Sequence, residues 1–283
     1  MLSNNSETLY LIKKHDFTVQ KRYGQNFLID ENVLKKIVDA AEITKSDHVI
    51  EIGPGLGTMT GLLCERAEKV TAVEIDKELI PILRETLVGY SNIEIINEDI
   101  LKLDLRSCLG DGGKSYKVVA NLPYYITTPI ILKLLEGKYP IESITVMIQK
   151  EVAERMQAGP GTKDYGALSL AVQYYSKPVI VTEVSKNSFY PKPKVDSTVV
   201  RLEIEKNGSV TVKDDQYMFR LIRASFNQRR KTLINGLTHG IPGLAKERVE
   251  EALNEMELPM TVRGEALTLK EFARLSDLLT ERQ

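Results

Sequence analysis

The sequence predicts an α/β fold, in which a doubly wound, mostly parallel sheet with an antiparallel final strand is followed by a small all-α domain. Two observations carry this prediction. Up to about residue 206, strand-like runs alternate with helix-like stretches, as they do in parallel sheets whose strands are joined by crossover helices. Beyond that point only helix-like stretches follow. We therefore expect a domain boundary close to residue 207.

The elements of the predicted sheet domain follow in order. A helix is expected to begin after Asp30, because aspartate is a good N-cap and apolar residues then recur on one helical face. Strands are expected at residues 48–53, 69–75, 92–99, 116–122, 143–150, 178–184 and 197–205. Helices are expected after Gly57 and at residues 76–87, 127–137 and 166–176. No helix-length segment separates the last two strands, so these two can pair antiparallel.

Three further helices are expected near the C-terminus, at residues 214–237, 245–256 and 267–282. We interpret the chain as three parts. They are a basic N-terminal arm (1–23), a sheet domain (24–206) and a helical domain (207–283).

Composition excludes several classes of protein. No apolar run among the 283 residues approaches the ~20 residues of a membrane span, and the N-terminus lacks the apolar core of a signal peptide. The two cysteines and three histidines form no disulfide or metal-binding pattern. We expect a cytoplasmic protein that acts as a monomer, without a metal site or a membrane contact.

The stretch VIEIGPGLGTMTGLL combines a strand, a glycine-rich turn and a helix. Gly53 and Gly55 permit a tight turn and a close approach of a ligand to the backbone. The next strand ends in Glu74, 21 positions after Gly53, where a carboxylate can accept hydrogen bonds from both hydroxyls of a ribose. A nucleoside-containing cofactor is expected, and these features fit NAD as well as S-adenosylmethionine.

Two details favour S-adenosylmethionine. The glycine spacing is GxGxG and lacks the third glycine of the dinucleotide fingerprint GxGxxG. Glu51 precedes the loop, where a negative charge suits the cationic ammonium and sulfonium groups of this cofactor but not a pyrophosphate. Asp99, at the end of the third strand, can accept a hydrogen bond from an adenine amino group; alternatively, it caps the following turn.

The fourth strand ends in Asn121, Leu122, Pro123 and Tyr124, at the same edge of the predicted sheet. An amine on a purine ring is a poor nucleophile, because its lone pair is delocalised into the ring. The Asn121 side-chain carbonyl and the Leu122 backbone carbonyl can hold such an amine, and Pro123 fixes the turn. Tyr124 offers a face on which an extruded base can stack, worth roughly 1–3 kcal/mol. The alternative is a plain strand-ending turn.

This N-L-P-Y motif resembles that of the ribosomal RNA adenine N6-dimethyltransferases, a family of Rossmann-like class I S-adenosylmethionine-dependent methyltransferases. Three other stretches resemble motifs of the same family. They are GQNFLID at 24–30, FYPKPKVDSTVVRL at 189–202 and SFNQRRKTL at 225–233. The motifs span nearly the whole chain.

Within this family the sequence is most similar to the small-subunit enzymes. The resemblance implies dimethylation at N6 of two adjacent adenosines in the 3′-terminal hairpin loop of small-subunit (16S) rRNA, linked to late assembly of that subunit. The rRNA or the pre-small subunit would be the partner, and S-adenosylhomocysteine the second product. The resemblance also implies that Phe189 stacks the target adenine opposite Tyr124, and that cofactor contacts fall on Asn26, Leu28, Gly53, Glu74, Asp99 and Asn121.

Although the net charge is only -1, basic residues gather locally. Local basic patches on a neutral protein can bind phosphates, although they can equally be solvated helix faces. The residues expected to hold the rRNA backbone are Lys21, Arg22, Lys192, Lys194, Arg223, Arg229, Arg230 and Lys231.

Three other functions remain open from the sequence. One is methylation of large-subunit rRNA, as in the related macrolide-resistance enzymes. Another is a non-catalytic role as an assembly or RNA-binding factor. The last is an NAD-dependent oxidoreductase, against which the missing third glycine and the lack of a residue suited to hydride chemistry argue.

Overall fold

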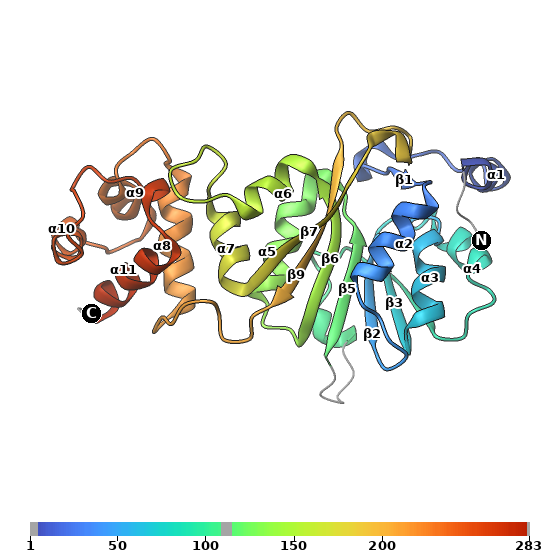
Figure 1. Cartoon of the computed structure of the whole chain (residues 1–283), viewed down its shortest axis with the longest axis horizontal. Coiled ribbons are helices and arrows are strands. Elements are labelled where there is room, and N and C mark those ends of the chain that lie inside the picture. The colour runs from blue at the N-terminus through green and yellow to red at the C-terminus, as the bar shows by residue number, and fades with distance from the viewer. Residues whose placement is uncertain (1–4, 109–114, 282–283) are drawn as a thin grey trace. The chain divides into compact units, whose positions relative to one another are not determined.

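The structure is a computed structural model that describes residues 5–108 and 115–281. Its contacts divide the chain into two compact units (Figure 1). The first unit runs to Ala153 and resumes over Pro178–Ile204. The second comprises Glu154–Lys177 and the chain from Glu205 onward.

A seven-stranded sheet forms the centre of the first unit, with the strand order β4-β3-β2-β5-β6-β9-β7. Neighbours from β4 to β6 pair in parallel, whereas β9 pairs antiparallel with β6. The predicted mostly parallel sheet is therefore confirmed, and its antiparallel final strand is β9. The strands are β2 (His48–Ile52), β3 (Lys69–Glu74), β4 (Ile93–Asn97), β5 (Tyr116–Asn121), β6 (Ile141–Gln149), β7 (Ser176–Val184) and β9 (Ser197–Ile204).

Helices α2 (Glu31–Ala40) and α3 (Thr58–Arg66) pack on one face of this sheet (Figure 1). The α2 helix begins as predicted, because Asp30 Oδ1 accepts hydrogen bonds from the N–H groups of Asn32 and Val33. Its apolar stripe packs on buried valines of the strands. The remaining helices of the crossovers are α4 (Ile80–Thr86) and α5 (Thr127–Glu136).

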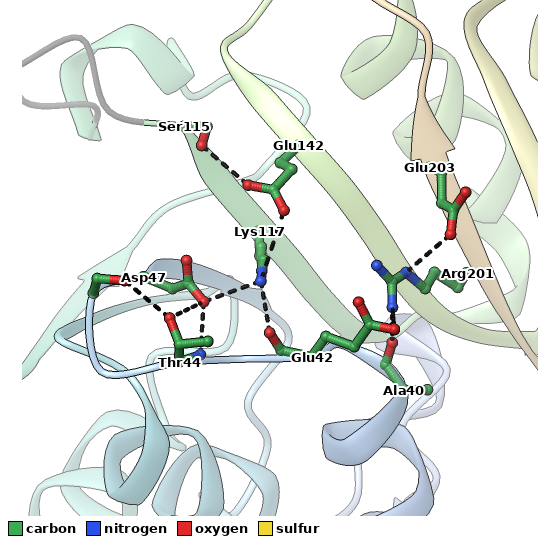
Figure 2. A network of polar contacts seen from close by, with 10 residues as sticks. Ala40, Glu42, Thr44, Asp47, Ser115, Lys117, Glu142, Arg201 and Glu203 are labelled. Carbon is green, nitrogen blue, oxygen red and sulfur yellow. Dashed lines mark hydrogen bonds and ion pairs between the residues drawn. The ribbon is translucent and has the colours of Figure 1, made fainter.

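A polar network ties the loop after α2 to strands β5 and β9 (Figure 2). Lys117 Nζ, on β5, donates to the Glu42 carbonyl at 2.6 Å and pairs with Asp47 at 3.0 Å. Arg201, on β9, donates to the Ala40 carbonyl at 2.9 Å and pairs with Glu42. Lys117 is only 6% exposed, so this network anchors the start of β5, the strand that ends at Asn121.

The stretch predicted as an N-terminal arm contains helix α1 (Asn5–Lys14), which packs on the first unit. Leu11 and Phe17 join a buried cluster with Phe27, Leu56 and Leu79. Two short strands follow in this region: β1 (Phe27–Leu28) pairs antiparallel with β8 (Phe189–Tyr190). The N-terminal segment is thereby joined to the chain that precedes β9.

The second unit is helical and contains α7 (Ala167–Tyr175), α8 (Asp215–Asn227), α9 (Leu233–Gly240), α10 (Lys246–Glu255) and α11 (Leu269–Glu281). Helix α7 belongs here because the rings of Tyr174 and Tyr175 pack against Phe219 of α8. Residues 154–177 thus pack with the C-terminal helices, although the sequence places them in the sheet domain. Propensity along the chain does not show which core a helix will join, and here an aromatic cluster decides it.

Two further expectations need correction. The helix predicted over 214–237 is two helices, because α8 ends at Asn227 and the Thr232 side chain caps the start of α9 by accepting from the Asn235 N–H. The helix α6 (Lys150–Gln157) was not predicted. It follows β6 directly, so its short apolar pattern merges with that of the strand. Among residues 5–108 and 115–281, no helix combines the length and apolar character that a membrane span requires.

Candidate active site

A cavity lies at the edge of the sheet where β2, β3, β4 and β5 end. It contains about 1060 Å³ of space that atoms do not fill, part of it open to solvent. From β2 the chain continues to β3 and β4 on one side and then returns to form β5 on the other side of β2. Open α/β sheets bind ligands at such a switch point.

The glycine turn after β2 lines this cavity as predicted. Gly53 and Gly55 have φ angles of 69° and 60°, which only glycine adopts without strain. The Gly53 N–H donates to the Val73 carbonyl at 2.9 Å. A Cβ on Gly55 would lie 3.2 Å from the ring of Phe27, so the turn also needs glycine for close packing.

Glu74 ends β3 beside this turn and is 4% exposed. Its two carboxylate oxygens accept the N–H groups of Asp76 at 2.8 Å and Gly55 at 3.3 Å. Burial raises the pKa of Glu74 to about 7, although these two N–H groups oppose the shift. The carboxylate is therefore fixed in orientation at the cavity wall, where its free lone pairs can accept hydroxyl groups.

Glu51 is a buried acid whose carboxylate has no hydrogen-bond partner among the described residues. It is 0% exposed and lines the cavity, and neither carboxylate oxygen has a partner within the described structure. Burial, and secondarily the charge of Glu74, raises the pKa of Glu51 to about 8. The Thr60 hydroxyl opposes this shift from nearby but makes no hydrogen bond of good geometry. An unpaired buried acid next to a cavity suits a cationic ligand, because the cation restores the charged form.

Apolar side chains line the part of the cavity near the ends of β3 and β4. Ile75, directly after Glu74, is 38% exposed, and Ile100 follows Asp99. Such surfaces suit the faces of an adenine ring. Sequence reasoning missed both residues, although their positions directly after the two predicted acids were a usable signal.

Asp99 lines the cavity and also closes a turn. Its Oδ1 accepts the Leu101 N–H at 2.9 Å, so the turn-capping alternative describes one of its oxygens. The cofactor contact predicted for Asp99 can therefore use only the carboxylate lone pairs that the Leu101 N–H does not occupy.

Asn121, Leu122, Pro123 and Tyr124 line the cavity at the end of β5. The Asn121 Nδ2 donates to the Asn26 carbonyl at 3.0 Å. The carbonyl of Pro123 accepts the Ile126 N–H at 3.2 Å and the Thr127 hydroxyl at 3.0 Å, which makes the turn rigid. The structure brings this predicted motif and the predicted cofactor residues together in one cavity.

Tyr124 is half-buried, and its hydroxyl lies 2.8 Å from Ser197 Oγ. Burial raises the pKa of Tyr124, so the ring stays neutral over the ordinary pH range. Ser197 is the first residue of β9 and is 0% exposed. The tether to Ser197 was not predicted, although the residue lies inside the motif FYPKPKVDSTVVRL.

Phe189 does not line this cavity. The family resemblance implies that it stacks a base, but it is 3% exposed and packs in the core with Leu28 and Val184. The pairing of β8 with β1 draws the side chain inward. Stacking by Phe189 would require it to leave this cluster, so the sequence-based placement needs correction for this conformation.

Residues 23–28 form one side of the cavity. Asn26 and Leu28, both predicted to contact the cofactor, are among them. Gln25 was not predicted, yet its Nε2 donates to Asp76 Oδ2 at 2.7 Å. The signal for Gln25 was its place inside GQNFLID, and the signal for Asp76 was its position two residues after Glu74.

The basic residues predicted to bind RNA in the first unit are exposed where they are described. Arg22 stacks over the Tyr23 ring, with its Cζ 4.6 Å from the ring centre. Lys192 and Lys194 are exposed in the loop that leads to Ser197. The side chain of Lys21 lies outside the described part of the structure.

In the second unit, Arg229 is committed to internal contacts. Its guanidinium pairs with Glu265 at 2.6 Å and donates to the carbonyls of Thr162 and Lys163. It therefore holds a loop in place and is poorly suited to bind a phosphate, contrary to the prediction. Arg223, Arg230 and Lys231 are exposed.

Comparison with known proteins adds an independent observation. The chain matches the family model described as ribosomal RNA adenine dimethylase over residues 16–280. It is 57% identical to the ribosomal RNA small subunit methyltransferase A of Lachnoclostridium phytofermentans, over 99% of this chain and 98% of that protein.

Two solved structures are also similar. One is a dimethyladenosine transferase from Plasmodium falciparum, with a TM-score of 0.73 and 30% identity over 87% of this chain and 94% of that one. The other is the 23S rRNA methyltransferase ErmE, with a TM-score of 0.65 and 29% identity over 90% of this chain and 100% of that one. The sequence motifs, the cavity and these matches agree that this chain belongs to the ribosomal RNA adenine dimethylase family, a family of rRNA adenine methyltransferases.

Proposed function

We propose that this protein transfers methyl groups from S-adenosylmethionine to N6 of two adjacent adenosines in the 3′-terminal hairpin loop of small-subunit rRNA. One observation carries the proposal: an unpaired buried acid and an amide-bearing N-L-P-Y turn line the same cavity. The 57% identity to a small-subunit enzyme, against 29% to a large-subunit one, supports the small subunit as the substrate. A cytoplasmic location and a monomeric state remain predictions.

The residues of the cavity fit this cofactor. Glu74 would accept the ribose hydroxyls, Asp99 the adenine amino group, and Glu51 would balance the positive charge. Gly53, Gly55, Asn26 and Leu28 would enclose the amino-acid portion. When bound, the cofactor supplies an electrophilic methyl group on a sulfonium.

The side chains at the end of β5 would hold the substrate amine. Asn121 Oδ1 and the Leu122 carbonyl would accept its two hydrogens, which favours a pyramidal nitrogen with a lone pair available for attack. Tyr124 would support the base by stacking. Most of the rate would come from positioning, because the two reactants are held at near-attack distance. The amine loses its proton to solvent after transfer, so no general base is required.

Exposed basic side chains would bind the rRNA backbone. Arg22, Lys192 and Lys194 in the first unit, together with Arg223, Arg230 and Lys231 in the second, are proposed for this role. Binding would then weaken steeply with salt, because each phosphate contact releases counterions. A target base in a loop can be splayed out of its stack at low cost, so that its amino group can reach the cavity.

The experiment that tests this proposal supplies purified protein with S-adenosylmethionine and three substrates. These are small subunits from an unmethylated strain, naked small-subunit rRNA and naked large-subunit rRNA. Mass spectrometry of the digested nucleosides would measure N6,N6-dimethyladenosine. We expect product with small-subunit substrates. Product only on large-subunit rRNA would mean that the protein acts as the macrolide-resistance enzymes do. No product on any of the three substrates would favour a non-catalytic binding factor.

A further inference from the structure

Residues 23–28, here termed the strap, line the cavity and are held to it at several points. The side chain of Gln25 makes the first attachment. Its Nε2 donates to Asp76 Oδ2 at 2.7 Å, and its Oε1 accepts the Gln20 N–H at 2.7 Å. Asp76 is 2% exposed, and its own N–H is bound by Glu74 at 2.8 Å. The strap is therefore hydrogen-bonded to the turn that follows β3.

The second attachment reaches the end of β5. The Asn26 carbonyl accepts the Asn121 Nδ2 at 3.0 Å, and the Asn26 side chain donates to the Gly24 carbonyl at 3.0 Å. A backbone carbonyl can only accept a hydrogen bond. The NH₂ group of Asn121 must therefore face the strap, which leaves Oδ1 as the end of the amide that is free to accept.

Packing holds the strap on either side of these two attachments. Phe27 is 8% exposed, and its ring lies against Gly55 of the glycine turn. Gly24 has a φ of 59°, and a Cβ there would lie 3.3 Å from the ring of Tyr125. The path of the strap thus depends on both glycines, and it brings the Asn26 carbonyl to a defined place.

We propose that the strap is a positioning element for methyl transfer: Gln25, bound to Asp76, places the Asn26 carbonyl so that it fixes the Asn121 amide with Oδ1 toward the substrate amine. This inference rests on the proposed function, because it assigns Asn121 Oδ1 to the amine. With the strap displaced, the amide can rotate and present its NH₂ group to the amine, where a donor faces a donor. Gln25 and Asn26 are positioning residues, since they act through Asn121.

The main test compares Gln25→Ala with the matched control Gln20→Ala. The Gln20 backbone N–H is kept in alanine, and no hydrogen bond of the Gln20 side chain occurs in the described structure. We expect Gln25→Ala to lower kcat at least tenfold at saturating cofactor and RNA, and Gln20→Ala to match the wild type. Gln25→Met, which keeps the length of the side chain but cannot donate, should behave as Gln25→Ala does, which guards against a packing defect.

Two further measurements separate positioning from a merely structural role. In the Asn121→Ala background, Gln25→Ala should cause no additional loss of kcat. In ¹⁵N-labelled protein without substrate, the Asn121 side-chain NH₂ signal, assigned by its loss in Asn121→Ala, should show slow proton exchange that Gln25→Ala abolishes. The NMR measurement needs no turnover, so it stands even if the wild type proves inactive on every rRNA, which would refute the proposed function instead.

Other results would overturn the inference. If Gln25→Ala weakens cofactor binding in calorimetry but leaves kcat at saturation unchanged, the strap only covers the cofactor. An unchanged Asn121 side-chain signal, or losses that add in the double variant, would show that Gln25 does not act through Asn121.

Discussion

The hydroxyl of Tyr124 lies 2.8 Å from Ser197 Oγ, joining the turn after β5 to the first residue of β9. The contact spans 73 positions in the sequence and fixes the ring that faces the cavity. It fixes the hydroxyl end of the side chain, and with it the direction in which the ring extends, which a stacking platform needs.

Loss of this contact should slow transfer without abolishing it. A net hydrogen bond is worth about 1 kcal/mol, so we expect Ser197→Ala and Tyr124→Phe each to lower kcat roughly fivefold. Their effects should not add, because both remove the same bond. Single-turnover kinetics would measure this. Ser276→Ala provides the control, since Ser276 is equally buried and its hydroxyl has no partner in the described structure. Full additivity would argue against the shared contact.

Asn121→Ala should reduce methyl transfer by a factor of about 100 or more, the range seen when a polar group that holds a transition state is removed. Cofactor affinity, measured by calorimetry, should change far less than kcat. The fold should remain intact, because the half-buried side chain makes one hydrogen bond here, to the Asn26 carbonyl. Turnover close to that of the wild type would show that Asn121 does not hold the amine.

The buried carboxylate of Glu51 should lower the stability of the cofactor-free protein at high pH while it favours binding of the cofactor. Its pKa of about 8 in the folded protein exceeds the ordinary 4.5, so between these pH values the folded state binds more protons than the unfolded state. Stability therefore falls as pH rises through this interval. Glu51→Gln should raise the melting temperature of cofactor-free protein at pH 8 by at least ~2 °C, with the difference vanishing near pH 4.5.

The same substitution should weaken binding of S-adenosylmethionine at least tenfold, because the cation loses its partner. For the wild type, affinity should rise between pH 6 and pH 8. Glu154→Gln, an exposed position, is the control for both measurements. A variant that binds the cofactor normally would remove Glu51 from the binding site.

Lys117→Met should destabilise the protein but spare the chemistry. The side chain is 7% exposed and donates to Asp47 and the Glu42 carbonyl, so the substitution removes both charged contacts at a cost of about 2 kcal/mol (Figure 2). Lys117 and Asn121 lie roughly 13 Å apart along β5, at about 3.3 Å per residue. Urea unfolding should show the loss, while kcat stays normal. Lys69→Met, which breaks an exposed pair with Glu94, should cost under ~1 kcal/mol.

Substitutions at the neighbouring residues Arg229 and Arg230 should affect different properties: stability at Arg229 and RNA binding at Arg230. Arg229→Ala should lower the free energy of unfolding, because Glu265 and two loop carbonyls lose their partner. Arg230→Ala should leave stability unchanged, weaken rRNA binding and reduce the salt slope by about 1. Filter binding between 50 and 200 mM salt would measure the slope. The opposite pattern would reverse the two assignments.

Much of the fold followed from local pattern. Alternation of strand-like and helix-like runs predicted the sheet, because the apolar pattern of each run is local. The Asp30 cap predicted the start of α2, because its hydrogen bonds join near neighbours. The prediction of one continuous helix over 214–237 was wrong, since α8 ends at Asn227 and Thr232 caps a new helix. The placement of residues 154–177 was also missed, because the choice between two cores depends on contacts that are distant in sequence.

By itself, the sequence determined which residues meet at the candidate site: a glycine turn, three acids and an N-L-P-Y turn at the ends of adjacent strands. Parallel strands bring their carboxyl ends to one edge, so this grouping needs no further information. Only the tertiary structure decided that Phe189 is buried, that Arg229 is committed to a loop and that Asn121 is bound by the Asn26 carbonyl. These facts depend on contacts between segments far apart in the chain, whose geometry is decided by packing and not by local propensity.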